Sequence, residues 1–322
     1  MKKGNVLEIK ALSVDFMTVR GIVYAVQGVD LEVQQGEIHG IVGESGCGKS
    51  VTSKSVIRLH NEETTRYAGD IYIRDDSGEK DVLAMSKKQL RDFRGSTAAM
   101  IFQDPMASLN ERAKVDYIVS EGLMNIRRDM KNDERQSKVA KALADVGLLP
   151  EFASRFPHEF SGGQRQRIGI ARSLVMEPEF IIADEPISAL DVSIRAQVLN
   201  LLSDLQKEHG LTYLFIAHDL SVMRFICDRI AVIHKGVIVE LAKTEKLFEH
   251  PLHPYTRALL SAIPMPDPDA EKTKVLQIYD PSIHNYAADP PCWSEIEEGH
   301  FIMANAEEME EYRRMLLNNA AE

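Results

Sequence analysis

The spacing of hydrophobic positions predicts strands near the start of the chain. Residues 6–16 and 23–33 alternate apolar and polar side chains, which is typical of strands with one buried face. Residues 38–42 form a short apolar strand that leads into a glycine-rich loop. After Ser50 the apolar spacing becomes helical, with positions near one face at Val51, Ser55, Val56 and Leu59.

A β-α-β pattern follows in the second half of the chain. Two continuous apolar runs, Phe180–Ala183 and Tyr213–Ala217, flank a helical stretch at 193–209. Such runs are typical of strands buried on both faces of a parallel sheet. We also expect short strands at 71–73 and 100–102, and helices at 115–148 and 161–175. Together these elements indicate an α/β fold.

The composition changes near residue 250. Eight of the 13 prolines lie between residues 251 and 291, which disfavours helix across most of that stretch. A short charged helix is predicted at 307–317. From Met265 onward there are 13 acidic and 4 basic residues, a net charge of −9, so only −2 of the total of −11 belongs to the first 264 residues. Because the chain has no basic excess, we expect no nucleic-acid partner.

The sequence gives no sign of a membrane span or of a signal peptide. No run approaches the roughly 18 apolar residues that a span needs, and the first ten residues lack an apolar stretch. Three scattered cysteines, Cys47, Cys227 and Cys292, fit a reducing cytosolic setting better than a disulfide framework.

The segment 43–50 carries a phosphate-binding pattern. Its residues fit G-x-x-x-x-G-K-[ST] in full: Gly43, Glu44, Ser45, Gly46, Cys47, Gly48, Lys49 and Ser50. Glycines let backbone N–H groups approach phosphate oxygens, and the following helix directs its positive end at the anion. We expect Lys49 to contact the β- and γ-phosphates and the Ser50 hydroxyl to ligate Mg²⁺. Cys47 is expected to be a small filler. A chance glycine loop is the alternative, and the flanking strand and helix argue against it.

Two acidic residues end the apolar strand at 180–183. Ligands gather at the carboxyl ends of parallel strands, which places Asp184 near Ser50, where it can hold Mg²⁺. Glu185 is then suited to orient and activate the attacking water. Solvated acids at a strand end are the alternative for this motif in isolation.

A helix is predicted to begin at the sequence Ser-Gly-Gly-Gln. Ser161 is a good N-cap residue, and Gly162 and Gly163 expose backbone N–H groups that could form a second anion site. Taken alone, the segment 161–164 is an ordinary helix start.

The order and spacing of these three motifs along the chain resemble those of the ATP-binding-cassette (ABC) ATPases. The resemblance implies a P-loop ABC ATPase fold with a RecA-like core, an antiparallel β subdomain and an α-helical subdomain at about 104–175. It also implies a head-to-tail dimer that binds ATP between the phosphate loop of one subunit and a segment of the other. That segment consists of Ser161, Gly162, Gly163 and Gln164.

Further short motifs match the same family. The resemblance implies that Gln103 senses Mg²⁺ and the γ-phosphate, and that His218 is the switch histidine that contacts the γ-phosphate. Asp191 belongs to the loop 188–191 that would cross the dimer interface.

The resemblance also implies a position for the adenine ring. Phe16 stands 33 residues before Lys49, where the family places an aromatic ring that stacks on adenine. A core position for Phe16 and a competing role for Tyr24 are the alternatives. We also expect Val51, which follows the loop, to be a nucleotide-binding residue.

A narrower resemblance is to the ATPases of oligopeptide/dipeptide permeases. It is carried by residues 102–110 (FQDPMASLN), 156–160 (FPHEF) and 251–264 (PLHPYTRALLSAIP). The run 188–240 is most similar to the F-type subunit of Gram-positive permeases, whereas 50–55 is more like the D-type subunit. The resemblance implies a nucleotide-binding domain at 1–250 and a C-terminal extension at 251–322.

The extension departs from the family in its cysteines. Many relatives carry several cysteines there that can hold an iron–sulfur cluster, which needs about four thiolate ligands. Because this extension has only Cys292, no iron–sulfur cluster is predicted.

The expected function is ATP hydrolysis that energises the import of oligopeptides or dipeptides. We expect the protein to be a peripheral subunit at the cytoplasmic face of the cell membrane. The expected partners are a second, D-type ATPase in a heterodimer, two transmembrane permease subunits and an extracellular peptide-binding protein. One alternative is the ATPase of a nickel or other small-solute importer. Another is a non-transport ABC ATPase, which the single cassette and the absence of a heptad run disfavour.

Overall fold

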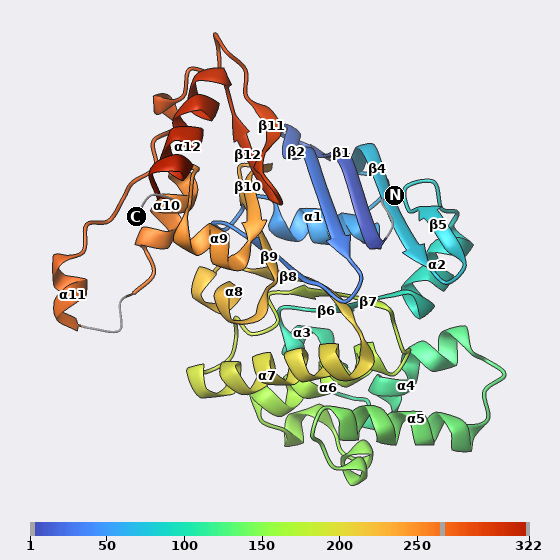
Figure 1. Cartoon of the computed structure of the whole chain (residues 1–322). Helices are drawn as coiled ribbons and strands as arrows, with labels where there is room; N and C mark the ends of the chain where they lie inside the picture. The colour runs from blue at the N-terminus through green and yellow to red at the C-terminus, as the bar shows by residue number, and fades with distance from the viewer. Residues whose placement is uncertain (1–3, 265–267, 320–322) are drawn as a thin grey trace.

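The computed structural model describes residues 4–264 and 268–319, and within them two sheets are formed (Figure 1). The first is antiparallel, with the strand order β2-β1-β4-β5, and the second has eight strands in the order β11-β12-β10-β9-β3-β8-β7-β6. The strands are β1 (Asn5–Thr18), β2 (Gly21–Gln34), β3 (Ile38–Val42), β4 (Thr65–Asp75), β5 (Gly78–Asp81), β6 (Ala98–Ile101), β7 (Phe180–Asp184), β8 (Thr212–Ala217), β9 (Arg229–His234), β10 (Val237–Lys243), β11 (Cys292–Glu297) and β12 (His300–Ala304).

Helices cover both faces of the eight-stranded sheet (Figure 1). The α-helices are α1 (Lys49–Val56), α2 (Lys87–Ser96), α3 (Pro105–Ser108), α4 (Val115–Ile126), α5 (Asn132–Asp145), α6 (Gly162–Leu174), α7 (Val192–His209), α8 (Leu220–Ile226), α9 (Thr244–Glu249), α10 (Pro254–Ser261), α11 (Pro268–Thr273) and α12 (Ala306–Asn319). Short 3-10 helices lie at Pro150–Ser154, Pro157–Glu159 and Pro281–Ile283.

The central strands separate two hydrophobic cores. Along β7, Ile181 and Ala183 pack with the core of helices α4 to α8, whereas Phe180 and Ile182 pack with the core formed by α1, α2 and the antiparallel sheet. Successive side chains of a strand point to opposite faces, so a strand buried on both faces must be apolar throughout. The neighbours β9, β3, β8, β7 and β6 run parallel. The predicted α/β fold with a mostly parallel sheet and an antiparallel β sheet is confirmed.

The helix after the phosphate loop is shorter than predicted. It ends at Val56, so Leu59 lies outside it and is 41% exposed. Arg58 adopts a left-handed backbone with φ 48°, which stops the helix as a left-handed residue commonly does.

The predicted helix at 115–148 is in fact two helices. The chain turns at 127–131, where the Met130 N–H donates to the Arg127 carbonyl at 3.0 Å. This turn lets α4 and α5 pack against each other as well as against α6. A hydrophobic period does not reveal such a turn, because both helices bury the same kind of face. Phe102, predicted to end a strand, lies just past β6.

The described part of the proline-rich stretch after residue 250 contains two short α-helices, α10 and α11, although most of the stretch is not helical. Pro254 occupies the first turn of α10, where the missing N–H leaves no hydrogen bond unmade. The charged helix predicted at 307–317 is confirmed as part of α12. Strand β12 pairs with β10, so residues 251–322, called the C-terminal segment below, continue the central sheet. The boundary at residue 250 stays a prediction.

Glu240 on β10 attaches the C-terminal segment to the rest of the chain. Its side chain is fully buried, and its carboxylate accepts hydrogen bonds from the backbone N–H groups of Leu252 (2.9 Å) and His253 (3.0 Å). The ring nitrogen Nε2 of His300, on β12, lies 2.8 Å from the same carboxylate. One buried acid therefore joins β10, the start of α10 and β12.

Replacing Glu240 by Ala should destabilise the protein by about 3 kcal/mol, because it leaves two backbone donors and one imidazole buried without their acceptor. Chemical denaturation monitored by circular dichroism measures the change. The matched control is Glu245→Ala on the exposed side of α9, which should change the unfolding free energy by less than about 0.5 kcal/mol. Equal losses in the two variants would contradict the role given to Glu240.

Candidate active site

The phosphate loop lies between the end of β3 and the start of α1. A Cβ atom on Gly43 would stand 2.2 Å from the Ile233 carbonyl oxygen, so the loop can pack against the end of β9 only with glycine there. Gly48 has φ 108° and a Cβ at this position would lie 2.8 Å from the Ala25 carbonyl oxygen. Close packing therefore requires glycine at position 43, and backbone shape and close packing both require it at position 48.

Lys49 is held inside this loop. Its side chain is 4% exposed, and Nζ donates to the carbonyl oxygens of Gly43 (2.7 Å) and Glu44 (2.8 Å). Cys47 is also buried, and burial raises the pKa of its thiol, which keeps it protonated. The environment of Cys47 is that of a filler, as predicted. Ser45 and Gly46 lie at the exposed rim of the loop.

Ser50 and Asp184 meet as predicted. The Ser50 hydroxyl donates to Asp184 Oδ1 at 2.8 Å, and Asp184 is only 3% exposed. Lys54, one helical turn after Ser50, lies 3.7 Å from the second carboxylate oxygen of Asp184. A hydroxyl and a carboxylate are ligands that Mg²⁺ accepts, so these two residues fit a magnesium site.

Two predicted catalytic side chains converge on a carboxylate oxygen of a third, Glu185. Gln103 Nε2 donates to Glu185 Oε2 at 3.1 Å, and His218 Nδ1 lies 3.4 Å from the same oxygen. Glu185 has a left-handed backbone with φ 48°, and its N–H donates to the Ile216 carbonyl of β8 at 3.0 Å. Non-glycine residues held in this conformation are found preferentially at functional sites. The His218 side chain is 56% exposed, so the arrangement opens to solvent.

The predicted second anion site starts α6, on the other face of the sheet. Ser161 caps the helix, since its hydroxyl accepts from Gln164 N–H and Gln164 Oε1 accepts from Ser161 N–H at 3.0 Å. The two glycines differ: a Cβ on Gly162 meets nothing within 4 Å, whereas one on Gly163 would lie 2.6 Å from Ile194 Cγ2 of α7. Helix α6 packs in the core opposite the one that contains α1.

The remaining predicted residues lie on the flanks of the loop and of α7. Val51 is half-buried in α1, and Asp191 is the N-cap residue of α7, without a side-chain cap bond. Phe16 is half-buried on β1, with its ring edge-on to His60 at 5.1 Å, while Tyr24 on β2 is 63% exposed. Both Phe16 alternatives therefore stay open.

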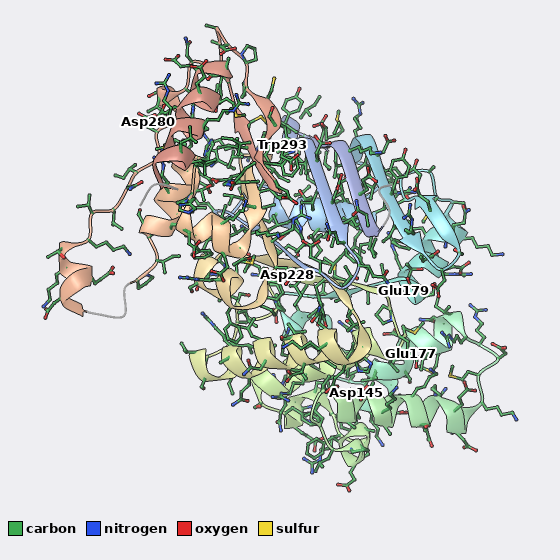
Figure 2. The ribbon with its side chains drawn as sticks, in the orientation of Figure 1. Asp145, Glu177, Glu179, Asp228, Asp280 and Trp293 are labelled. Carbon is green, nitrogen blue, oxygen red and sulfur yellow. The ribbon has the colours of Figure 1, made fainter. Side chains whose placement is uncertain are left out.

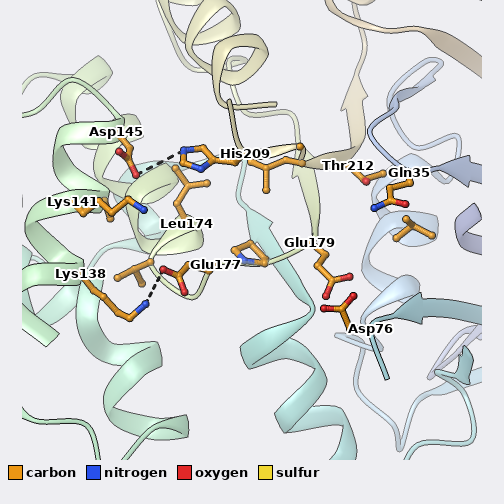
Figure 3. Close-up of a pocket in the computed structure, with 16 residues that line it drawn as sticks. Gln35, Asp76, Lys138, Lys141, Asp145, Leu174, Glu177, Glu179, His209 and Thr212 are labelled. Atoms are coloured by element: carbon orange, nitrogen blue, oxygen red, sulfur yellow. Dashed lines mark hydrogen bonds and ion pairs between the residues drawn. The ribbon is translucent and has the colours of Figure 1, made fainter. Parts of the chain in front are cut away.

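A cavity of about 350 Å³ lies at the opposite edge of the sheet (Figure 3). Its lining includes Pro178 and Thr212, at the starts of β7 and β8, whereas the predicted site lies at the ends of these strands. The charges in its wall are partly paired, with Lys138 Nζ 2.7 Å from Glu177 (Figure 3). Burial, with the negative charges of Asp76 and Asp75, raises the pKa of Glu179. No predicted site residue lines this cavity.

Comparison with known proteins agrees with this geometry. A family model described as ABC transporter matches residues 26–188, and one described as Oligopeptide/dipeptide transporter, C-terminal region, matches residues 239–292. The oligopeptide transport ATP-binding protein AmiF of Streptococcus pneumoniae is 55% identical over 97% of this chain and 99% of its own length. The chain belongs to the ABC transporter ATP-binding proteins.

Further relatives extend the comparison. The oligopeptide transport ATP-binding protein OppF of Bacillus subtilis is 52% identical, covering 96% of this chain and 99% of its own. A solved dimeric ATP-binding cassette, MJ0796 in a post-hydrolysis state bound to ADP and Pi, superimposes with a TM-score of 0.65. It is 29% identical and covers 74% of this chain and 98% of its own.

Two contacts of this ABC ATPase site were not predicted from sequence. One is Lys54, whose position four residues after Ser50 could have indicated it, because that spacing shares a helix face. The other is Tyr255 of the C-terminal segment, whose hydroxyl oxygen accepts a hydrogen bond from the backbone N–H of Glu44 at 3.1 Å. The two are 211 residues apart, and no local pattern relates them.

The two glycines that start α6 should respond differently to alanine. Gly163→Ala should cost about 1–3 kcal/mol, because the new methyl group overpacks the contact with Ile194. Gly162→Ala, the matched control, should leave the unfolding free energy within about 0.5 kcal/mol. Thermal or chemical denaturation measures both. Adding Ile194→Ala, which removes the clashing methyl group, should recover part of the Gly163→Ala loss, and failure to do so would refute the packing explanation.

Proposed function

We propose that this chain is the ATP-binding and ATP-hydrolysing subunit that energises an ABC importer of oligopeptides or dipeptides. The observation that carries the ATPase part is the convergence of Gln103 and His218 on Glu185, beside the Ser50–Asp184 pair. The match of residues 239–292 and the names of the relatives support the peptide part.

The phosphate loop binds the nucleotide. Its backbone N–H groups and Lys49 hold the β- and γ-phosphates. Two carbonyl oxygens of the loop accept hydrogen bonds from Lys49 Nζ, which keeps this positive charge within the loop that binds the phosphates. Ser50 and Asp184 would hold Mg²⁺, which when bound offsets the negative charge of the phosphates. Phe16 is the proposed adenine platform.

Glu185 takes the proton of the attacking water. Gln103 donates a hydrogen bond to its carboxylate, and His218 lies beside the same oxygen. These two contacts fix the orientation of the carboxylate that accepts the proton. The strained backbone of Glu185 keeps this oxygen at the carboxyl edge of β7, next to Asp184. The Asp184 carboxylate, bound to Ser50, remains available for the metal.

A second ATPase completes the site. The residues 161–164 start a helix on the face of the sheet opposite α1, so within one chain they pack away from its phosphate loop. We propose a head-to-tail heterodimer with a D-type subunit, in which Ser161, Gly162, Gly163 and Gln164 face the partner's nucleotide and Asp191 lies at the interface.

The described part of the chain offers no helix that is long and apolar enough to cross a bilayer. Two transmembrane permease subunits would supply the pathway and an extracellular protein would deliver the peptide, with this subunit peripheral at the cytoplasmic face.

Glu185→Gln should leave ATP binding intact and lower ATP turnover at least about a hundredfold, because the amide cannot accept a proton from water. Phosphate release and equilibrium binding of labelled ATP measure the two properties. Glu179→Gln is the matched control, because it makes the same change at the opposite end of β7 and should keep turnover. Full turnover in the Glu185 variant would refute the assignment.

The transported solute is tested in cells that lack this subunit. The wild-type chain should restore uptake of a labelled tetrapeptide, whereas the Glu185→Gln variant should not. Restored uptake of labelled nickel without restored peptide uptake would replace the peptide proposal by the small-solute alternative.

A further inference from the structure

Tyr255 links the C-terminal segment to the phosphate loop. It lies on α10, is 2% exposed, and its hydroxyl oxygen accepts a hydrogen bond from the backbone N–H of Glu44 at 3.1 Å. Glu44 is the second residue of the phosphate-binding motif. The contact satisfies one backbone donor of the loop with a side chain from outside the motif.

The same loop residue also holds Lys49. The carbonyl oxygen of Glu44 accepts from Lys49 Nζ at 2.8 Å, while its N–H donates to Tyr255. The two peptide groups that flank Glu44 are therefore both held by side-chain hydrogen bonds. Lys49 holds the carbonyl oxygens of both peptide groups, and Tyr255 of the C-terminal segment holds the N–H of the first.

The position of Tyr255 is itself determined by buried hydrogen bonds. The N–H of Tyr255 donates to His253 Nδ1 at 3.1 Å, and the N–H of His253 donates to the Glu240 carboxylate. Burial, with the positive charges nearby, lowers the pKa of His253 to about 3, so its imidazole is neutral and Nδ1 can accept. A continuous chain of bonds runs from Glu240 through His253 and Tyr255 to Glu44.

Ring contacts hold the tyrosine from the side. Its ring centroid lies 4.2 Å from that of His234 and 5.4 Å from that of Tyr279. His234 ends β9, and two residues later Gly236 N–H donates to the Cys47 carbonyl at 2.8 Å. The phosphate loop thus contacts both Tyr255 and the turn after β9, and the last residue of β9 packs on the Tyr255 ring.

We propose that Tyr255 is a positioning residue that holds the phosphate loop in its nucleotide-binding shape, so that the C-terminal segment sets part of the affinity for ATP and ADP. This inference rests on the proposed ATPase function. When the N–H groups of the loop are already in place, phosphate binding does not include the entropy cost of ordering the loop. Because the same groups contact ground state and transition state, the contribution belongs to binding rather than to kcat.

Linkage requires the reverse effect. If the docked segment strengthens nucleotide binding, nucleotide must strengthen docking of the segment by the same factor. The chain has a single tryptophan, Trp293, on β11 of the C-terminal segment (Figure 2), where it packs with Phe301 against the core of the antiparallel sheet. Its fluorescence reports whether the segment is docked.

The test compares two single hydroxyl deletions in the full chain. Tyr255→Phe should weaken the binding of ADP and ATP about fivefold, the worth of one net hydrogen bond, and leave kcat at saturating ATP within about twofold. Tyr279→Phe makes the same change in the neighbouring ring and should leave nucleotide affinity unchanged. Equilibrium binding and ATP hydrolysis measure the two quantities, and unchanged Trp293 fluorescence at low temperature checks that the segment stays docked.

The thermal midpoint of the Trp293 fluorescence change gives the second readout. Saturating ADP should raise this midpoint in the wild type and in Tyr279→Phe, and raise it less in Tyr255→Phe. Wild-type affinity in Tyr255→Phe, equal losses in both variants, or no ADP shift in the wild type would overturn the inference. A wild-type protein that binds no nucleotide would instead overturn the proposed function, and with it this inference.

Discussion

The hydrogen bond between Ser50 and Asp184 is the interaction on which the site depends. It joins the first turn of α1 to the end of β7, although β8 lies between β3 and β7 in the sheet. The bond forms only if β3, β8 and β7 run parallel and end at the same edge. That requirement explains why residues 180–183 of β7 and 213–217 of β8 are apolar: a parallel sheet with helices and a second sheet on its faces leaves no polar side for these strands.

The same edge explains the strain at Glu185. Asp184 still belongs to β7 and is needed by Ser50, so the next residue must turn away at once if its carboxylate is to face a different group. The left-handed backbone of Glu185 makes that turn, and the bond from its N–H to the Ile216 carbonyl holds it. Gln103 arrives from the end of β6 and His218 from the end of β8, the two strands that flank β7. The two flanking strands thus deliver two side chains to one oxygen of the carboxylate that follows β7.

Local pattern predicted the parts of the fold that a local cause produces. The apolar runs at 180–183 and 213–217 and the Ser161 cap follow from neighbouring residues alone, and the structure has them at those positions. The turn at 127–131 and the early end of α1 were missed, because each depends on how a helix packs rather than on its period. The pairing of Ser50 with Asp184 was predictable only because motif order implied strand order. The contact of Tyr255 with Glu44 was not predictable, since nothing in either segment specifies the other.

The net negative charge of the C-terminal segment does not explain how the segment is held against the phosphate loop. The segment carries most of the net negative charge of the chain, yet the groups that fix it against the phosphate loop are buried and mostly neutral. They are a carboxylate enclosed by hydrogen-bond donors, a histidine kept neutral by burial, and a tyrosine whose hydroxyl stays protonated because burial raises its pKa. Buried contacts of this kind are little affected by salt, whereas exposed charges are screened within about 10 Å at ordinary ionic strength. The two properties are thus separable: buried contacts place the segment against the phosphate loop, and none of those contacts uses an acidic side chain of the segment.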